Sequence, residues 1–249
     1  MDQRMQKALY DCENHKIGLD EPFLFKCREC GKCCKNRDDI LLTSRDLFNI
    51  AQFFNKTPVE IIKRYCEDYI GESSRIPVVR LKPQGRESAC PLFLNKHCTV
   101  HSIKPVVCAL YPIGRAAIIP QETACAGIPE DIQPGYFLQR IKCGSREETH
   151  TVRDWLEQFG IPLDDEFYSL WNSVIIFLSD YFTQLEADKP PESVIGHLWD
   201  IAYSALYICY DIEADFLHQF RAMAPKLKKI LSQQKDKYYQ MAEVVSNGE

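Results

Sequence analysis

The sequence predicts a mainly α protein with small irregular and β elements, in which a loop-rich segment precedes a helical region. Two observations support this prediction. Ten of the twelve cysteines lie between Cys27 and Cys143, whereas amphipathic stripes at helical spacing dominate after about residue 149. We therefore expect a cysteine-rich domain over residues 1–148 and a helical C-terminal region over residues 149–249.

The first half is expected to contain short helices and one strand. Residues 1–15 predict a short helix, and residues 43–46 and 57–60 each form a capping-box pattern that predicts the start of another. Cys66 falls on the apolar stripe of the helix that begins at residue 57, so we interpret it as a small core residue. Residues 76–82 are β-branched and alternate in polarity, which predicts a strand.

The second half shows wide apolar and aromatic stripes that are typical of a packed helical core. They predict helices over residues 152–159, 167–185, 193–212 and 214–245. Cys209 lies in the third of these stripes, so we assign it to the core rather than to a functional site.

Charge and hydropathy exclude several classes of protein. The formal net charge is −5, which gives no general attraction to nucleic acid or to anionic membranes. No apolar run approaches the roughly 20 residues that a membrane-spanning helix needs, and residues 1–4 are not followed by the apolar core of a signal peptide. We expect a cytoplasmic protein that binds a protein or small-molecule partner, without nucleic acid or membrane.

The first cysteine segment predicts a metal centre. In a reducing compartment, clustered cysteines indicate metal or redox chemistry rather than disulfides. Cys27, Cys30 and Cys33 repeat a two-residue spacing that lets sulfurs converge about a tight turn, and Gly31 permits the backbone conformation such a turn needs. Cys34 can serve the same centre only if the turn is tightly curled; otherwise it faces a second site or packs. We therefore expect the loop-rich domain to be a cysteine-ligated metal domain.

A second segment supplies Cys90, Cys98 and Cys108, each next to an expected turn. His97 and His101 flank Cys98. We interpret both histidines as exposed turn residues, with a ligand role for His101 as the alternative, since histidine is a common metal ligand.

These two segments resemble the YkgJ-type cysteine-cluster family, the zinc- or iron-chelating CxxCxxCC domain proteins, over about residues 25–114. Two positions depart from the family pattern: His101 stands where an aromatic residue is usual, and Lys104 replaces an arginine. The resemblance implies a metal centre. The matching positions are residues 25–34, Leu42, Thr43, Asp46, residues 90–94, Cys98, Lys104, Pro105, Cys108, Tyr111 and Pro112.

The number of cysteines leaves the kind of centre open. Seven cysteines match the family, which exceeds the four that one zinc ion or one [4Fe–4S] cluster needs and falls short of two such sites. Cys125 and Cys143 would raise the number to nine. Thiolates suit both metals, but few histidines lie nearby, so we expect an iron–sulfur cluster of the [4Fe–4S] type, with zinc as the alternative. The expected ligands are Cys27, Cys30, Cys33, Cys34, Cys90, Cys98, Cys108, Cys125 and Cys143.

The sequence is consistent with two functions. The first is an iron–sulfur protein with redox or enzymatic chemistry, of which methyl transfer is one form, because flagellin lysine N-methylases are a related cysteine-rich group. The second is a zinc-stapled binding module without catalysis. The sequence contains no phosphate-binding glycine loop, no Gly-x-Ser-x-Gly and no dinucleotide fingerprint.

Overall fold

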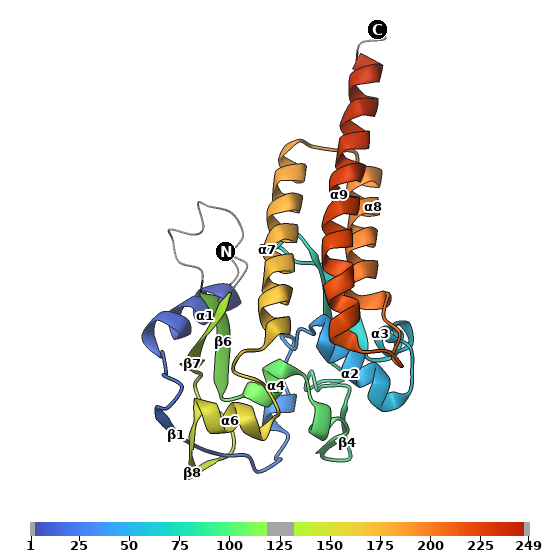
Figure 1. The fold of residues 1–249 in the computed structure, drawn as a ribbon. Helices are drawn as coiled ribbons and strands as arrows, with labels where there is room; N and C mark the ends of the chain where they lie inside the picture. Colours follow the sequence, from blue (N-terminus) through green and yellow to red (C-terminus); the bar gives the residue numbers. More distant parts are fainter. Residues whose placement is uncertain (1–2, 119–131, 247–249) are drawn as a thin grey trace.

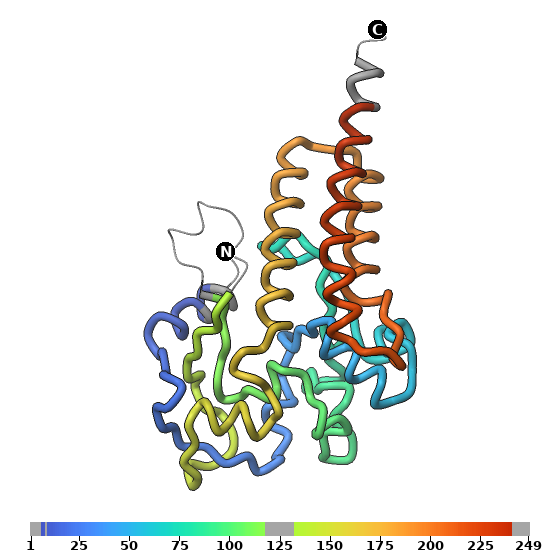
Figure 2. The backbone as a smooth tube through the Cα atoms, viewed as in Figure 1, coloured from blue at the N-terminus to red at the C-terminus, as the bar shows by residue number. Residues whose placement is uncertain are grey.

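The structure is a computed structural model that describes residues 3–118 and 132–246 (Figures 1 and 2). It is mainly helical with small two-stranded sheets, as the sequence predicts. Three long helices lie side by side and rise from a base that contains the cysteine-rich loops (Figure 1). These helices are α7 (Glu166–Ala187), α8 (Glu192–Tyr203) and α9 (Phe216–Ser246).

Shorter helices build the base. Two of them begin at the predicted capping boxes, since Thr43 with Asp46 caps α2 and Thr57 with Glu60 caps α3. The short helices are α1 (Gln3–Asn14), α2 (Ser44–Phe54), α3 (Pro58–Tyr65), α4 (Val106–Leu110) and α6 (Val152–Gln158), with 3-10 turns η1 (Lys32–Cys34) and η2 (His101–Ile103).

Each described sheet is an antiparallel pair of strands. The pair β1 and β8 joins the two ends of the cysteine-rich region, whereas the other pairs join neighbouring segments. The pairs are β1 (Pro22–Lys26) with β8 (Ser145–Thr151), β2 (Cys66–Ile70) with β3 (Pro77–Leu81), β4 (Phe93–Leu94) with β5 (His97–Cys98), and β6 (Ile113–Ile118) with β7 (Gln133–Leu138).

Three element boundaries differ from the sequence predictions. The helix α3 ends at Tyr65, because Cys66 already pairs with Leu81 as the first residue of β2. Residues 149–151, which the sequence assigned to the helical C-terminal region, complete β8 because they pair with β1, and the predicted helix begins at Val152 as expected. The helix α8 changes at Ser204–Ile208 into a single π-helical turn. In the first case, pairing with the neighbouring strand β3 overrides a local helical pattern.

The larger hydrophobic core spans both halves of the chain. It packs α2, α3 and β3 against the three long helices, and Ile50, Val79, Phe182 and Phe220 are each fully buried within it. Cys66 is buried in the same core, as predicted. The boundary at residue 148 stays a prediction, and residues from both sides of it share this core.

A smaller core supports the start of the cysteine loops. Phe23 and Phe25 of β1 pack against Trp155 of α6, with ring centroids 5.8 and 5.6 Å apart. The Trp155 indole N–H donates to the carbonyl oxygens of Ala109 and Leu110 at the end of α4. This core therefore joins β1, α4 and α6, and β1 ends at Lys26, next to the first cysteine of the loop. No described helix combines the length and apolar character that crossing a bilayer requires.

Candidate metal centre

Six of the predicted ligands line a single cavity of about 70 Å³. They come from three separate stretches of the chain, which the fold brings together. Apolar side chains, among them Ile40, Leu81, Leu92 and Phe93, form much of the remaining wall. The six cysteines are Cys27, Cys33, Cys34, Cys90, Cys98 and Cys108.

The first cysteine loop is tightly curled, which is the condition under which the adjacent Cys33 and Cys34 can serve one centre. Gly31 adopts a left-handed conformation with φ of +68°, and the Cys34 N–H donates to the Gly31 carbonyl over 3.0 Å. The turn η1 follows directly. As a result, the sulfurs of Cys33 and Cys34 lie 3.9 Å apart and both thiols line the cavity.

The second segment is docked onto this loop through the backbone. The Cys90 N–H donates to the Cys34 carbonyl over 2.7 Å. Farther along, Asn95 and Lys96 both have positive φ, as a two-residue hairpin turn requires, and the hairpin places Cys98 opposite Phe93. The hairpin therefore brings Cys98 to the cavity while Phe93 covers Gly31.

The third segment is held by a buried carboxylate. Asp46 is 6% exposed, and its Oδ2 accepts from the Thr43 N–H and hydroxyl over 2.9 and 2.8 Å. Its Oδ1 accepts from the Val106 N–H over 2.8 Å, at the start of the helix that carries Cys108. Burial raises the pKa of Asp46, while these three donors support its ionised form. The capping motif of α2 thus also positions a cysteine of the cavity.

Cys30 and Cys143 lie beside the cavity rather than on its lining. The Cys143 thiol interacts with the Cys33 thiol and with Tyr111. The pairing of β8 with β1 brings the segment before β8 next to the first cysteine loop. The approach is close at Gly144, where a Cβ would lie 2.5 Å from the Lys26 carbonyl oxygen. Cys125 lies outside the described residues.

Electrostatics favours a thiolate at Cys33. Hydrogen bonding from the Cys143 and Cys34 thiols, together with the positive charge of Arg37, lowers the pKa of Cys33 well below that of a free thiol. Arg37 Nη1 also donates to the Cys33 carbonyl over 3.2 Å. Thiolate is the form that binds metal. Burial instead raises the pKa of the metal-free thiols of Cys90, Cys98 and Cys108.

Of the remaining histidines and cysteines considered as ligands or core residues, one lies at the cavity and three do not. His101 lines the cavity and its Nε2 lies 4.0 Å from a Glu29 carboxylate oxygen, whereas His97 is exposed and is not part of the lining. Cys12 lines a different pocket, and Cys209 is exposed after the π-helical turn, not buried in the core as predicted, because the helix has already ended there.

Sequence reasoning missed Arg37 as a residue of the site. Its guanidinium lines the cavity together with Lys104, so two cations face the thiols. The available signal was an arginine three positions after the last cysteine of the first loop. Among the described residues, no three His, Cys, Asp or Glu side chains are gathered closely enough for a single ion to bind them all.

Comparisons with known proteins agree with this part of the chain. Residues 26–126 match the CxxCxxCC family, described as "Putative zinc- or iron-chelating domain", so the resemblance predicted from the sequence is confirmed there. An uncharacterized protein of Methanocaldococcus jannaschii is 31% identical over 109 residues, which are 40% of this chain and 52% of that protein. The chain thus spans about half the length of this curated relative. No solved structure matches the chain.

Replacing Gly31 with alanine is expected to disrupt the centre. A Cβ there would lie 2.0 Å from the Phe93 ring, in addition to the cost of positive φ. Gly85 is a matched control, because it has φ of +67° with nothing within 4 Å of its Cβ position. Urea unfolding should show a loss of about 1 kcal/mol for Gly85→Ala and roughly twice that or more for Gly31→Ala, which should also bind less metal. Equal losses of stability and full metal content in both variants would contradict this account.

Proposed function

We propose that the cysteine-lined cavity holds an iron–sulfur cluster of the [4Fe–4S] type. The observation that carries this proposal is the donor set: six thiols and one imidazole, that of His101, line a cavity with largely apolar walls. Iron–sulfur clusters are held by cysteine thiolates, and a shielded apolar environment suits them. Cys143 is available as a further donor beside Cys33.

Arg37 and Lys104 would offset the negative charge of the bound centre. Both side chains line the cavity, and the Arg37 guanidinium is fixed by its bond to the Cys33 carbonyl and by an ion pair with Asp39. The charge of Arg37 acts on Cys33 and Cys108, and that of Lys104 acts on Cys98, so both cations favour the ionised ligands over free thiols. When bound, such a cluster supplies one-electron transfer.

The exposed first cysteines suggest where a partner would approach. Cys27 and Cys30 are exposed, whereas Cys90 is buried on the inner side of the same site. A redox partner protein or a small-molecule substrate would therefore reach the centre from the side of the first loop. We propose redox or enzymatic chemistry at this face, in a cytoplasmic protein.

A zinc-stapled binding module is the second candidate, and one distance favours it. The 3.9 Å between the sulfurs of Cys33 and Cys34 is close to the edge of a tetrahedral zinc site, about 3.8 Å for zinc–sulfur bonds of about 2.3 Å. In that case the metal would hold the loops together and the protein would have no catalytic role.

The visible spectrum of protein purified without oxygen distinguishes the two candidates. The proposal predicts a brown protein with broad thiolate-to-iron charge-transfer absorption that bleaches on reduction, and with iron and acid-labile sulfide in proportion. The absorption should be lost in the Cys33→Ser variant, whereas Cys209→Ser should retain it. A colourless protein that contains zinc without iron or labile sulfide would replace the iron–sulfur proposal with the zinc module.

A further inference from the structure

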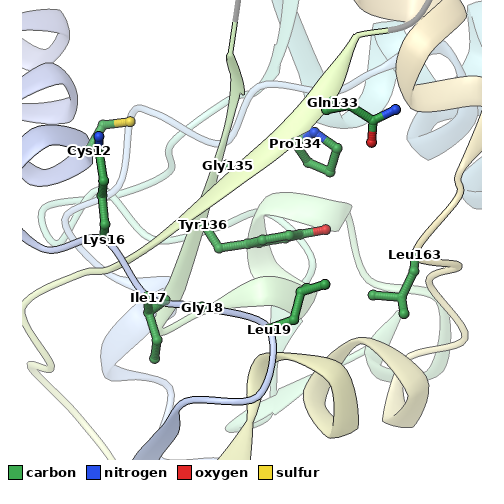
Figure 3. A pocket seen from close by; sticks show the side chains of 10 residues that line it. All are labelled: Cys12, Lys16, Ile17, Gly18, Leu19, Gln133, Pro134, Gly135, Tyr136 and Leu163. Carbon is green, nitrogen blue, oxygen red and sulfur yellow. The ribbon is translucent and has the colours of Figure 1, made fainter.

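A second pocket of about 400 Å³ lies apart from the cysteine cavity. It is bordered by the segment after α1, by β7 and by the loop before α7. Ile17, Leu19, Pro134 and Leu163 give it apolar walls, and the ring of Tyr136 extends from β7 across it (Figure 3). This volume lies within the range of pockets that bind small molecules, roughly 300–1,000 Å³.

Tyr136 connects this pocket to a buried polar cluster. Its cross-strand partner is Arg115 of β6, and side chains of directly opposed residues share one face of a strand pair. The Arg115 guanidinium lies 4.1 Å from the centroid of the Tyr168 ring. Tyr136 and Tyr168 are each 8% exposed, and neither hydroxyl donates a hydrogen bond of good geometry in the described part of the chain, although the Tyr136 oxygen interacts with the Arg115 guanidinium. Two buried donors are therefore unsatisfied next to a guanidinium, which is costly unless a ligand or water pairs with them.

The cluster also carries an excess positive charge. Asp165 is the carboxylate that faces Arg115, at 3.8 Å, and both side chains are less than a tenth exposed. However, Asp165 is already engaged by both terminal nitrogens of Arg45, one of them at 2.8 Å. Within the described residues, two guanidinium groups thus share one carboxylate, and Arg115 is the buried one, since the Arg45 side chain is 29% exposed. A buried charge without a full partner is strongly disfavoured, so this site is suited to receive an anion.

We propose that the body of a small apolar carboxylic acid occupies the pocket and that its carboxylate reaches past Tyr136, which lines the pocket, to Arg115 and Tyr168, which lie behind the lining. A guanidinium pairs with a carboxylate through two parallel hydrogen bonds, and the two hydroxyls can donate to the same oxygens. The single excess charge matches a monoanion, and the apolar walls match a hydrocarbon body. This inference does not depend on the metal in the cysteine cavity.

The test uses the full-length protein and calorimetric titration with benzoate and hexanoate. Benzamide and hexanamide serve as matched neutral probes of nearly the same shape. At least one of the two carboxylates is expected to bind saturably, with a dissociation constant in the millimolar range or below. The corresponding amide should bind at least roughly tenfold more weakly. The reason is that a hydrogen bond to a charged group contributes about 1.5–3 kcal/mol, which is more than tenfold in affinity. Absence of saturable binding by both carboxylates, or equal binding of acid and amide, would overturn the proposal.

Variants assign the binding to the named residues. Arg115→Gln should weaken carboxylate binding by roughly tenfold or more, while Asp165 keeps its pairing with Arg45. Tyr136→Phe removes only the hydroxyl and should weaken the same binding without affecting the fold. Arg140→Gln is the control, because Arg140 is exposed and does not line this pocket. Unchanged affinity in both Arg115→Gln and Tyr136→Phe would place the binding elsewhere and contradict the assignment.

Discussion

Replacing Cys33 with serine is expected to remove most of the metal from the purified protein, roughly a tenfold reduction or more in metal per chain. Cys33 is the cysteine whose thiol contacts both Cys34 and Cys143, and its lowered pKa supplies the thiolate that a metal requires. Serine keeps the size of the side chain but is a poor ligand for zinc or iron–sulfur centres. Cys27→Ser and Cys30→Ser are expected to act in the same direction, since both belong to the same loop.

Two cysteines away from the cavity provide the controls for this experiment. Cys209 is exposed beyond the π-helical turn, and Cys12 lines the pocket of Figure 3. Cys209→Ser and Cys12→Ser should each retain the metal content of the unmodified protein, measured by elemental analysis after anaerobic purification. If Cys33→Ser kept its metal, or if either control lost it, the assignment of the cysteines would be wrong.

Replacing Asp46 with alanine is expected to destabilise the protein by about 3 kcal/mol. The substitution removes the Asp46 half of the capping box, while Thr43 can still accept from the backbone N–H of residue 46. It leaves the Val106 and Thr43 N–H groups without their acceptor, which costs about 1–3 kcal/mol for each buried donor. Because Val106 opens the helix that carries Cys108, the variant should also bind less metal. Urea unfolding monitored by circular dichroism measures the first effect, and elemental analysis measures the second.

Glu60 offers a matched comparison for Asp46. It closes the capping box of α3 in the same way, through the Thr57 N–H and hydroxyl, but its carboxylate is exposed and reaches no second helix. Glu60→Ala should therefore destabilise the protein less than Asp46→Ala and should leave the metal content unchanged. Equal effects of the two substitutions would show that the contact from Asp46 to Val106 has no structural importance.

Local patterns were sufficient to predict most of the helices. The capping boxes at Thr43 and Thr57 set the starts of α2 and α3, and the apolar stripes located α6, α7 and α9. The strand β8 was not predicted because its partner among the described strands, β1, lies more than a hundred residues earlier in the chain. Single-sequence periodicity contains no information about such a pairing.

In the candidate site too, local features could be predicted from the sequence, whereas features that depend on tertiary contacts could not. The spacing of Cys27, Cys30 and Cys33 was enough to predict a metal centre, and Gly31 was correctly identified as the residue that allows the turn. The roles of Asp46 and Arg37 could not be predicted, because each depends on a contact made across the tertiary structure. The ligand role of each cysteine remains a prediction.

The position of the metal itself tests most directly whether the cysteine-lined cavity is the metal centre. Crystals of anaerobically purified protein, measured on both sides of the iron and zinc absorption edges, would locate each metal by anomalous scattering. We expect an anomalous peak inside the cavity bounded by Cys33, Cys90, Cys98 and Cys108, at the iron edge if the iron–sulfur proposal holds. Protein-bound metal found only outside this cavity, or crystals of freshly prepared protein without any metal, would contradict it.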